Sequence, residues 1–451
     1  MLPPVGLPAP PGWLLPSLAL VIGAALPLYA WRVRGRVYAG FAGVVVLLSF
    51  PAALLLAEHL QALLGPLAGW GFVYAFGAAG VHHSGLVRAR LRRPLYRYAL
   101  SLPGMALVAL GALCVPYFAA RALFWGLFEL LGAAGAQSAL RWLDLLPPLV
   151  IALSLATSLR LRREIVRIEL GGATPEVLTR LPLLRHRHRP RRAARARARA
   201  RVAPRGDAAP LRDSPARPLR IVQITDPHLG PWQPLHRLRR RIEELLGHNP
   251  DLVLLTGDFL TMEGNGTPGA LAQALAPLAN APGRCFACLG NHDHEALHEV
   301  ESALAECGVS LLVDDAAQAR TPLGPVQILG ADFHRRGRSE RLAALFARFP
   351  RQAGRLRLLL LHDPMHFRDV PKNEVDLALS GHTHGGQIGL VSLGFNWTVL
   401  SRSPWPDHGL FGHGASRLYV HRGTGFYGFP LRIGVPGEAS LLELVPAKPA
   451  E

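Results

Sequence analysis

Long apolar runs dominate the first third of the chain. Five of them reach the ~20 residues that a bilayer-spanning helix needs, at 13–31, 37–57, 67–87, 99–120 and 143–159. A sixth candidate, 122–139, contains Glu129 and Gln137, which favour an interfacial or packed helix. The pattern predicts an all-α transmembrane helical region over residues 1–160 with about five spans. A soluble bundle of buried helices is the weaker alternative, because soluble core helices rarely run this long without charge.

The pattern changes in the second half of the chain. Apolar runs of four or five residues occur at 221–225, 252–255, 285–289, 358–361 and 375–379, and are typical of strands buried on both faces. Runs with helical periodicity lie between several of them, at 235–246, 269–278, 295–306 and 339–349. Each short apolar run leads into Asp, Asn or His and then turn residues. Because active sites of α/β sheets gather at the carboxyl ends of strands, these polar side chains are expected to converge.

The polar residues at the strand ends have the chemistry of metal ligands. The last motif, Gly381-His382-Thr383-His384-Gly385-Gly386-Gln387, places two imidazoles two residues apart, so an extended segment directs both to one side. The earlier strand ends carry Asp226-Pro227-His228, Gly257-Asp258, Gly290-Asn291-His292-Asp293 and His362-Asp363. Mixed nitrogen and oxygen ligands suit Mn, Fe, Zn or Co and argue against Ca.

In combination these motifs resemble the calcineurin-like metallophosphoesterases, over roughly residues 217–446. The Gly-Gly-Gln ending, Arg422-Gly423-x-Gly425 and Pro430-Leu431-Arg432 are similar to a bacterial branch that includes membrane-attached members. The resemblance implies an α/β fold, a two-sheet αββα sandwich, following the helical region. It also implies a cofactor of two divalent metal ions, which clamp a phosphate and activate a bridging water as hydroxide.

The resemblance further implies the ligand set. One ion is expected at Asp226, His228, Asp258 and His384, and the other at Asp258, Asn291, His362 and His382, with Asp258 as the bridge. His292 is expected to contact the phosphate and to protonate the leaving oxygen. Relatives often carry an Asp three residues after the bridging Asp, where this chain has Thr261. Asp293 or His294 is therefore expected to orient the ring of His292.

Positive charge is concentrated between the two halves. The formal net charge is +18, and residues 185–220 contain thirteen arginines against two aspartates. We expect residues 161–216 to form a juxtamembrane segment and an Arg-rich disordered linker, and residues 217–451 to form the phosphoesterase domain. The tract has three interpretations: a solvated linker, a site for anionic lipid headgroups, or a nucleic-acid site. Nucleic acid is disfavoured because the tract lacks aromatic residues for base stacking.

Arginines also mark alternate connections between the expected spans. They follow the first, third and fifth spans, at Arg32, Arg34, Arg36, Arg88, Arg90, Arg92, Arg93, Arg97, Arg160, Arg162, Arg163 and Arg167. Positive connections stay in the cytoplasm, so five spans predict an inner (cell) membrane protein with a cytoplasmic catalytic domain. A sixth span would reverse this. The start of the chain has no secretory-signal pattern, so the first span is expected to remain as an anchor.

The four cysteines add little chemistry. Cys285 and Cys288 form a C-x-x-C within an expected strand, where residues three apart face opposite sides. With no second C-x-x-C to complete a zinc site, core packing is the better interpretation.

The predicted function is a membrane-anchored dimetal phosphohydrolase that cleaves a phosphoester or pyrophosphate. Its expected partners are membrane lipids and a phosphorylated small-molecule or lipid substrate, and membrane attachment favours a lipid-linked phosphate. One alternative is a cyclic-nucleotide or nucleic-acid phosphodiesterase. A non-catalytic membrane scaffold is an alternative of another class, and the complete ligand set argues against it.

Overall fold

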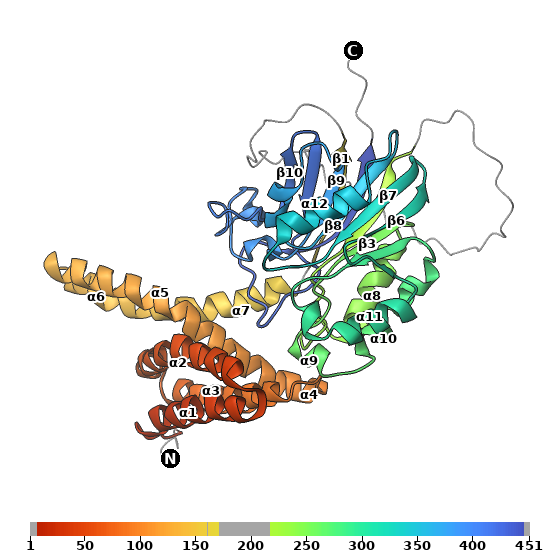
Figure 1. The fold of residues 1–451 in the computed structure, drawn as a ribbon. Helices are drawn as coiled ribbons and strands as arrows, with labels where there is room; N and C mark the ends of the chain where they lie inside the picture. The colour runs from red at the N-terminus through yellow and green to blue at the C-terminus, as the bar shows by residue number, and fades with distance from the viewer. Residues whose placement is uncertain (1–6, 160, 171–216, 446–451) are drawn as a thin grey trace, which may run out of the picture.

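The computed structural model describes residues 7–159, 161–170 and 217–445. A helical region, red to yellow in Figure 1, is followed by an α/β sandwich, green to blue. The helical region consists of α1 (Leu14–Arg34), α2 (Arg36–Leu64), α3 (Pro66–Val87), α4 (Pro94–Tyr96), the π-helical turn η1 (Arg97–Ser101), α5 (Leu102–Leu130), α6 (Ala134–Leu140), η2 (Arg141–Leu145) and α7 (Leu146–Ser158).

By length and composition, four helical stretches within the described residues could cross a membrane: Leu14–Arg34, Arg36–Leu64, Pro94–Leu130 and Ala134–Ser158. The expected third span forms α3 but is not among the four, since five glycines and two histidines reduce its hydropathy. The expected fourth span and the candidate at 122–139 also differ from prediction. The fourth span and the first part of the candidate form one helix that ends at Leu130, within which Arg121 pairs with the buried Asp144, and residues 134–139 of the candidate lie in α6.

The first sheet has the order β1-β12-β2-β3-β4-β5. Its strands β2 to β5 are parallel, and β12 runs antiparallel to β2. The helices α8, α10 and α11 pack on its outer face through Leu238, Leu271 and Leu304. The bounds are β1 (Leu161–Glu169), β2 (Leu219–Ile224), β3 (Leu252–Thr256), β4 (Cys285–Cys288), β5 (Ser310–Leu311), β12 (Gly437–Val445), α8 (Leu235–Leu246), α9 (Met262–Asn265), α10 (Ala270–Leu275), η3 (Ala276–Asn280), η4 (Asp293–Glu295) and α11 (Leu297–Glu306).

The second sheet has the order β10-β11-β9-β8-β7-β6. Strands β11, β9, β8 and β7 are parallel, and the two edge strands are antiparallel to their neighbours. Helix α12 covers its outer face through Leu342 and Leu345. The bounds are β6 (Asp315–Thr321), β7 (Gly324–Ala331), α12 (Arg338–Arg348), β8 (Leu356–Leu361), η5 (Pro364–Asp369), β9 (Leu377–Ser380), η6 (His384–Gly386), η7 (Val391–Leu393), β10 (Gly409–His413) and β11 (Ser416–Val420).

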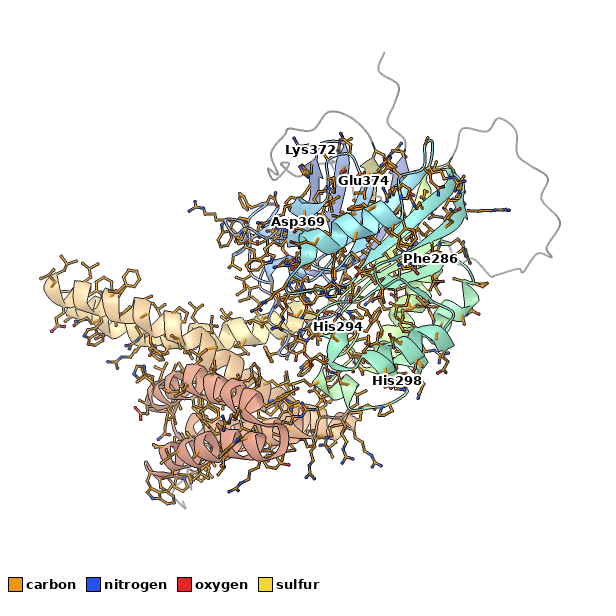
Figure 2. The ribbon with its side chains drawn as sticks, in the orientation of Figure 1. Phe286, His294, His298, Asp369, Lys372 and Glu374 are labelled. Atoms are coloured by element: carbon orange, nitrogen blue, oxygen red, sulfur yellow. The ribbon has the colours of Figure 1, made fainter. Side chains whose placement is uncertain are left out.

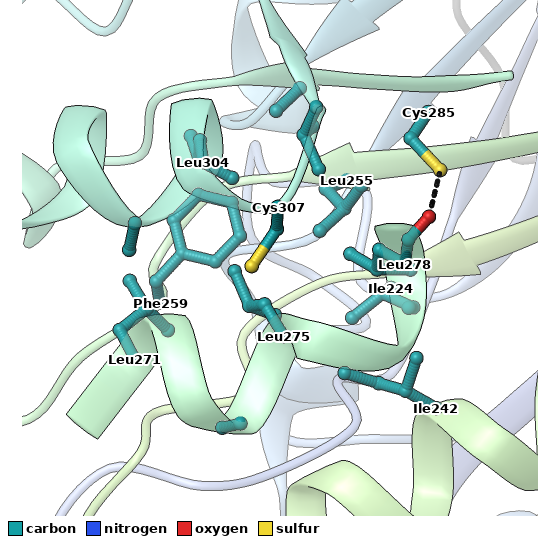
Figure 3. Close-up of a cluster of buried hydrophobic side chains, with 14 of the residues drawn as sticks. Ile224, Ile242, Leu255, Phe259, Leu271, Leu275, Leu278, Cys285, Leu304 and Cys307 are labelled. Carbon is teal, nitrogen blue, oxygen red and sulfur yellow. Dashed lines mark hydrogen bonds between the residues drawn. The ribbon is translucent and has the colours of Figure 1, made fainter. Parts of the chain in front are cut away.

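The two sheets pack face to face with helices outside, so the predicted αββα sandwich is confirmed. Residues such as Leu254, Leu360 and Leu379 fill the space between the sheets. The five expected strands correspond to β2, β3, β4, β8 and β9. Cys285 and Cys307 lie in the apolar layer beneath α10 and α11 (Figure 3), and all four cysteines are buried and free.

One strand lies where a linker was expected. Residues 161–169 form β1, which pairs in parallel with β12 along its whole length. Three arginines and two glutamates obscure the alternation of Val166 and Ile168, of which Ile168 is only 1% exposed. The arginines at 162, 163 and 167 therefore lie on the edge of the catalytic sheet and not in a membrane-proximal loop. The rest of the expected linker, including the Arg-rich tract, lies outside the described residues.

The helical region and the sandwich are joined by direct contacts. The Leu91 amide donates to Thr267 Oγ1 (2.8 Å), and Arg97 donates to the Pro231 carbonyl (3.1 Å). At the end of α7, Ser158 Oγ donates to the Pro430 carbonyl (2.7 Å). The connection after α3 and the end of α7 therefore lie on the side of the helical region that carries the catalytic domain (Figure 1).

Candidate metal centre

The loops that follow β2, β3, β8 and β9 meet at one edge of the sandwich. The Asp226 amide donates to the Gly257 carbonyl (3.0 Å), and the Gly381 amide donates to the His362 carbonyl (3.0 Å). The His382 amide donates to the carboxylate of Asp226 at 3.0 and 3.1 Å, which ties the first motif to the last. The strand ends therefore converge as the buried apolar runs predicted.

Two groups of potential ligands lie at this edge. In the first, Asp226, His228 and His384 each present an atom within 4.8 Å of the others. His384 Nε2 lies 3.2 Å from His228 Nε2 and 3.4 Å from Asp226 Oδ1. All three residues are buried. This arrangement suits a cation, which would satisfy two ring nitrogens and a carboxylate that water does not reach.

The second group contains Asp258, His362 and His382. His362 Nε2 lies 3.2 Å from Asp258 Oδ2 and 3.2 Å from His382 Nδ1. The same Asp258 Oδ2 is 3.8 Å from His228 Nε2 of the first group. Asp258 therefore stands between the two groups, and the rings of His382 and His384 belong to different groups.

Asn291 provides an independent test of whether these residues suit metal ions. Its Oδ1 atom is buried and has no hydrogen-bond partner among the described residues. A buried unpaired amide oxygen costs about 1–3 kcal/mol, so its retention calls for a ligand. A divalent transition metal accepts a neutral oxygen donor together with carboxylate and imidazole ligands. The residues present fit the expected cofactor.

The backbone at the site is strained. Five of the expected ligands adopt left-handed conformations: Asp226 (φ 48°), His228 (φ 45°), Asp258 (φ 58°), His382 (φ 67°) and His384 (φ 50°). Residues other than glycine adopt this region at a cost of order 1–3 kcal/mol each, and such residues cluster at functional sites. The structure around them therefore holds the side chains in place before any ligand binds.

Two motif glycines make room for the ligands. A Cβ atom at Gly381 would lie 2.1 Å from Asp226 Oδ2, and one at Gly290 would lie 2.3 Å from Asp258 Oδ1. Any other residue at either position would displace a carboxylate of the site.

Burial sets the protonation of the rings. It lowers the pKa of His228 to about 4 and that of His382 to about 4, so both rings are neutral at pH 7 and offer a lone pair. His362 differs, because the charge of Asp258 outweighs burial and raises its pKa to about 10. A cation that binds there must displace this proton, so binding is expected to release protons.

His292 is oriented by a residue that the sequence did not indicate. Its Nδ1 lies 3.1 Å from Glu295 Oε1, and its ring stacks on Tyr427 with centroids 4.5 Å apart. Burial acts to lower the pKa of His292, but the hydrogen bond to Glu295 and the charge of Asp258 outweigh it and raise the pKa. The ring therefore has a bound carboxylate and an aromatic neighbour that fix its position.

The two expected orienting residues have other partners. Asp293 accepts hydrogen bonds from the amides of Asp258, Phe259 and Gly290 at 2.7–2.8 Å. His294, which lies on the side of the sandwich facing the helices (Figure 2), pairs with Asp332 at 3.0 Å. The expectation that Asp293 or His294 orients His292 is therefore wrong. Asp293 is hydrogen-bonded to backbone amides, and His294 is paired with Asp332, 38 residues away in sequence.

The buried Arg432 side chain hydrogen-bonds to the backbone of the first ligand group, at His384. It is 1% exposed, and its guanidinium donates to the carbonyls of His384 (3.0 Å), Arg422 (2.7 Å) and Gly425 (2.8 Å). The Arg432 amide donates to Ser158 Oγ of α7 (2.8 Å). Arg432 thus contacts both His384, a potential metal ligand, and the end of the apolar helix α7.

Comparisons with known proteins agree with this geometry. Residues 219–386 match the model of the calcineurin-like phosphoesterase family. The chain is 32% identical to the phosphodiesterase YaeI of Escherichia coli, over 51% of this chain and 83% of that protein. The chain belongs to the calcineurin-like metallophosphoesterases. This metallophosphoesterase is therefore a metal-dependent hydrolase of phosphoesters.

Two further relatives extend the picture. The metallophosphoesterase is 30% identical to YkuE of Bacillus subtilis, an uncharacterized metallophosphoesterase, over 50% of this chain and 78% of that one. It is also 28% identical to a transmembrane protein with a metallophosphoesterase domain from Danio rerio, over 50% of this chain. The match spans 53%, about half, of that relative. Together with the four apolar helices, this relative indicates membrane association.

Proposed function

We propose that the protein is a membrane-anchored phosphohydrolase that cleaves a phosphoester or pyrophosphate at two divalent ions. The observation that carries this proposal is the position of Asp258 between two ligand groups, within 3.8 Å of a ring nitrogen in each. The first ion would be held by Asp226, His228, Asp258 and His384, and the second by Asp258, Asn291, His362 and His382. Bound ions of this kind acidify a water molecule and neutralise the phosphate.

The chain itself supplies positioning and a proton. The hydrogen bond to Glu295 stabilises the charged form of His292 and, against the effect of burial, raises its pKa, so in this proposal His292 donates a proton to the leaving oxygen. Tyr427 restricts the ring by stacking on it. The amide of His292 donates to Asp258 Oδ1 (2.9 Å), so the proton donor and the bridging carboxylate are held in fixed relation.

Metal removal tests the proposal. Treating the purified full-length protein with a chelator should abolish hydrolysis of bis-p-nitrophenyl phosphate. Without metal ions, the Asp and His side chains of the two ligand groups can neither activate water nor neutralise the phosphate. Adding Mn, Fe, Zn or Co should restore the rate, and elemental analysis should approach two ions per chain at full activity. A protein that hydrolyses this ester equally well after complete chelation would contradict the proposal.

Membrane attachment shapes the choice of substrate. The catalytic domain contacts the helices through Leu91, Arg97 and Ser158, so the metal centre stays close to the membrane. This arrangement favours a phosphate carried by a lipid over a soluble nucleotide. Lipid extracts from cells with and without the protein should then differ in a phosphorylated lipid, and identical extracts would argue against a lipid substrate.

The catalytic domain lies on the cytoplasmic side of the inner membrane in this proposal. Arg34 and the 88–97 segment lie on the same side as the catalytic domain, since Arg34 lines a cavity with Met262 and Arg97 binds Pro231. Arginine-rich connections remain cytoplasmic. Because the native cysteines are buried, a cysteine at the exposed Arg335 reports on orientation. It should react with an impermeant maleimide only after the cells are opened, and a cysteine at Gly12 should react in intact spheroplasts. The reverse pattern would place the domain outside.

A further inference from the structure

A cavity of about 230 Å³ lies between the helical region and the catalytic domain, away from the metal ligands. One wall comes from the end of α3, the connection after it and η1. The other comes from Gly230, Pro231, Leu235 and Glu263. Pro94 and Tyr96 of α4 and Glu263 of α9 line this cavity, and the Leu91 amide donates to Thr267 at the same junction, where α4 and α9 are labelled in Figure 1.

The cavity is positively charged. Arg90, Arg92 and Arg97 line it, and among the described residues Glu263 is the one carboxylate that does so. Glu263 already accepts a hydrogen bond from Thr261 Oγ1 (2.9 Å). Within the described part of the chain, none of the three arginines forms an ion pair with a carboxylate. The positive charge of the cavity is therefore left for a ligand to neutralise.

Two buried polar atoms at the cavity lack partners among the described residues. His82 is 3% exposed, and its Nε2 has no hydrogen-bond partner. Arg97 uses its terminal nitrogens on the Pro231 carbonyl (3.1 Å) and Tyr98 Oη (3.0 Å), which leaves its Nε unpaired. Buried groups of this kind are usually satisfied, so an acceptor in the cavity would account for both.

The position of the cavity at the end of the apolar helices indicates which molecule supplies the hydrogen-bond acceptor. Helix α3 ends at Val87 and α5 begins at Leu102, so the segment between them lies at the end of the apolar bundle. Lipid phosphates lie at this level of a bilayer. Leu86, Leu91 and Pro94 supply an apolar part of the wall. A ligand with an anionic phosphate and an attached apolar body matches both parts.

We infer that this cavity binds the phosphate group of an anionic membrane lipid. Arginine is suited to this role because its planar guanidinium donates several hydrogen bonds to phosphate oxygens. The site is separate from the metal centre: a void of only about 20 Å³, lined by His228, Met105 and Trp232 among others, lies between them. A void of that size holds about one water molecule. The bound lipid therefore holds the catalytic domain against the membrane and is not hydrolysed there.

Lipid binding to the full-length protein in detergent tests this inference, with native mass spectrometry as the readout. Phosphatidylglycerol is the probe, and phosphatidylcholine is the comparison with no net charge. The wild type should retain phosphatidylglycerol in preference to phosphatidylcholine. The double variant Arg90→Gln/Arg92→Gln should bind phosphatidylglycerol about 10-fold more weakly or worse.

The same connection offers a matched control. Arg88 and Arg93 are exposed and do not line the cavity. The double variant Arg88→Gln/Arg93→Gln therefore removes equal charge and should leave phosphatidylglycerol binding within about 2-fold of wild type. Arg90 is exposed, so Arg90→Gln alone is a milder variant that should still weaken binding, by about 3-fold, if the larger change impairs folding.

Three results would overturn the inference. Equal losses in the two double variants would indicate general attraction to a basic surface. Unchanged binding in Arg90→Gln/Arg92→Gln would show that the lipid binds elsewhere. Competition by glycerol 3-phosphate at concentrations similar to those of the lipid would make the ligand a soluble phosphate ester. These outcomes are independent of phosphatase activity, so they also leave the proposed function to its own test.

Discussion

Replacing Asp258 with Asn is expected to lower kcat/KM for bis-p-nitrophenyl phosphate by at least about 1,000-fold, or about 4 kcal/mol. The Asp258 carboxylate is the group that reaches both ligand clusters, at 3.2 Å from His362 Nε2 and 3.8 Å from His228 Nε2. An amide keeps the shape of the side chain but removes the negative charge that the two proposed cations need. The metal content, measured by elemental analysis, should fall together with the rate.

Two variants separate metal loss from other effects. Asp315→Asn makes the same change on the edge strand β6 and should leave both rate and metal content unchanged. His292→Asn should lower kcat while the metal content stays near that of wild type, because His292 lies in neither ligand group. If Asp258→Asn keeps more than a tenth of the wild-type rate, the bridging role of Asp258 is wrong.

Replacing Glu438 with Gln is expected to destabilise the catalytic domain by about 3 kcal/mol. Glu438 is 2% exposed and accepts hydrogen bonds from Arg422 Nε (3.0 Å), from the Arg422 amide (3.2 Å) and from Tyr419. Although burial opposes it, the charges of His421 and Arg422 hold the pKa of Glu438 well below its usual value. Its contribution is therefore fully present at neutral pH and is lost progressively as the pH falls below the pKa that an unfolded glutamate has. The thermal midpoint of the full-length protein in detergent at pH 7 measures the effect.

The same strand supplies the control for this prediction. Glu443 also lies on β12, but it is 28% exposed and approaches Arg220 only to 3.9 Å. Glu443→Gln should change stability by less than about 0.5 kcal/mol. Similar midpoints for the two variants would show that the buried pair of Arg422 and Glu438 contributes no more than a surface contact.

The apolar runs were sufficient to predict the buried strands and the convergence of their ends, whereas the two-sheet sandwich was predicted from the resemblance to the metallophosphoesterase family. Strands buried on both faces are continuous apolar runs, as in 252–255 and 358–361, so they stand out from their surroundings. The polar residue after each run could then be placed at a common edge. The positions of Asp226, Asp258 and His362 follow from this local pattern alone.

Other features depend on contacts between distant segments. Strand β1 has no apolar run, and its Glu164 is placed by an ion pair with Arg422 (3.0 Å), far away in the sequence. Tyr427 reaches His292 only because the 422–432 segment folds back over the site. Glu295 lies near His292 in sequence, three residues further on, but its role depends on the turn η4 between them. Local sequence patterns do not predict such contacts between distant segments.

The edge strand β1 also determines the distance between the two described chain ends on either side of residues 171–216. Glu169 at the end of β1 pairs with Val445, and Leu219 at the start of β2 pairs with the adjacent Leu444. These two ends are therefore two strand spacings apart, about 10 Å. The described chain therefore stops at β1 and resumes at β2 in the same sheet, and the catalytic domain is connected to the helical region through α7 and β1. The height of the metal centre above the bilayer is thus independent of the length of the segment 171–216, which can vary without moving the active site.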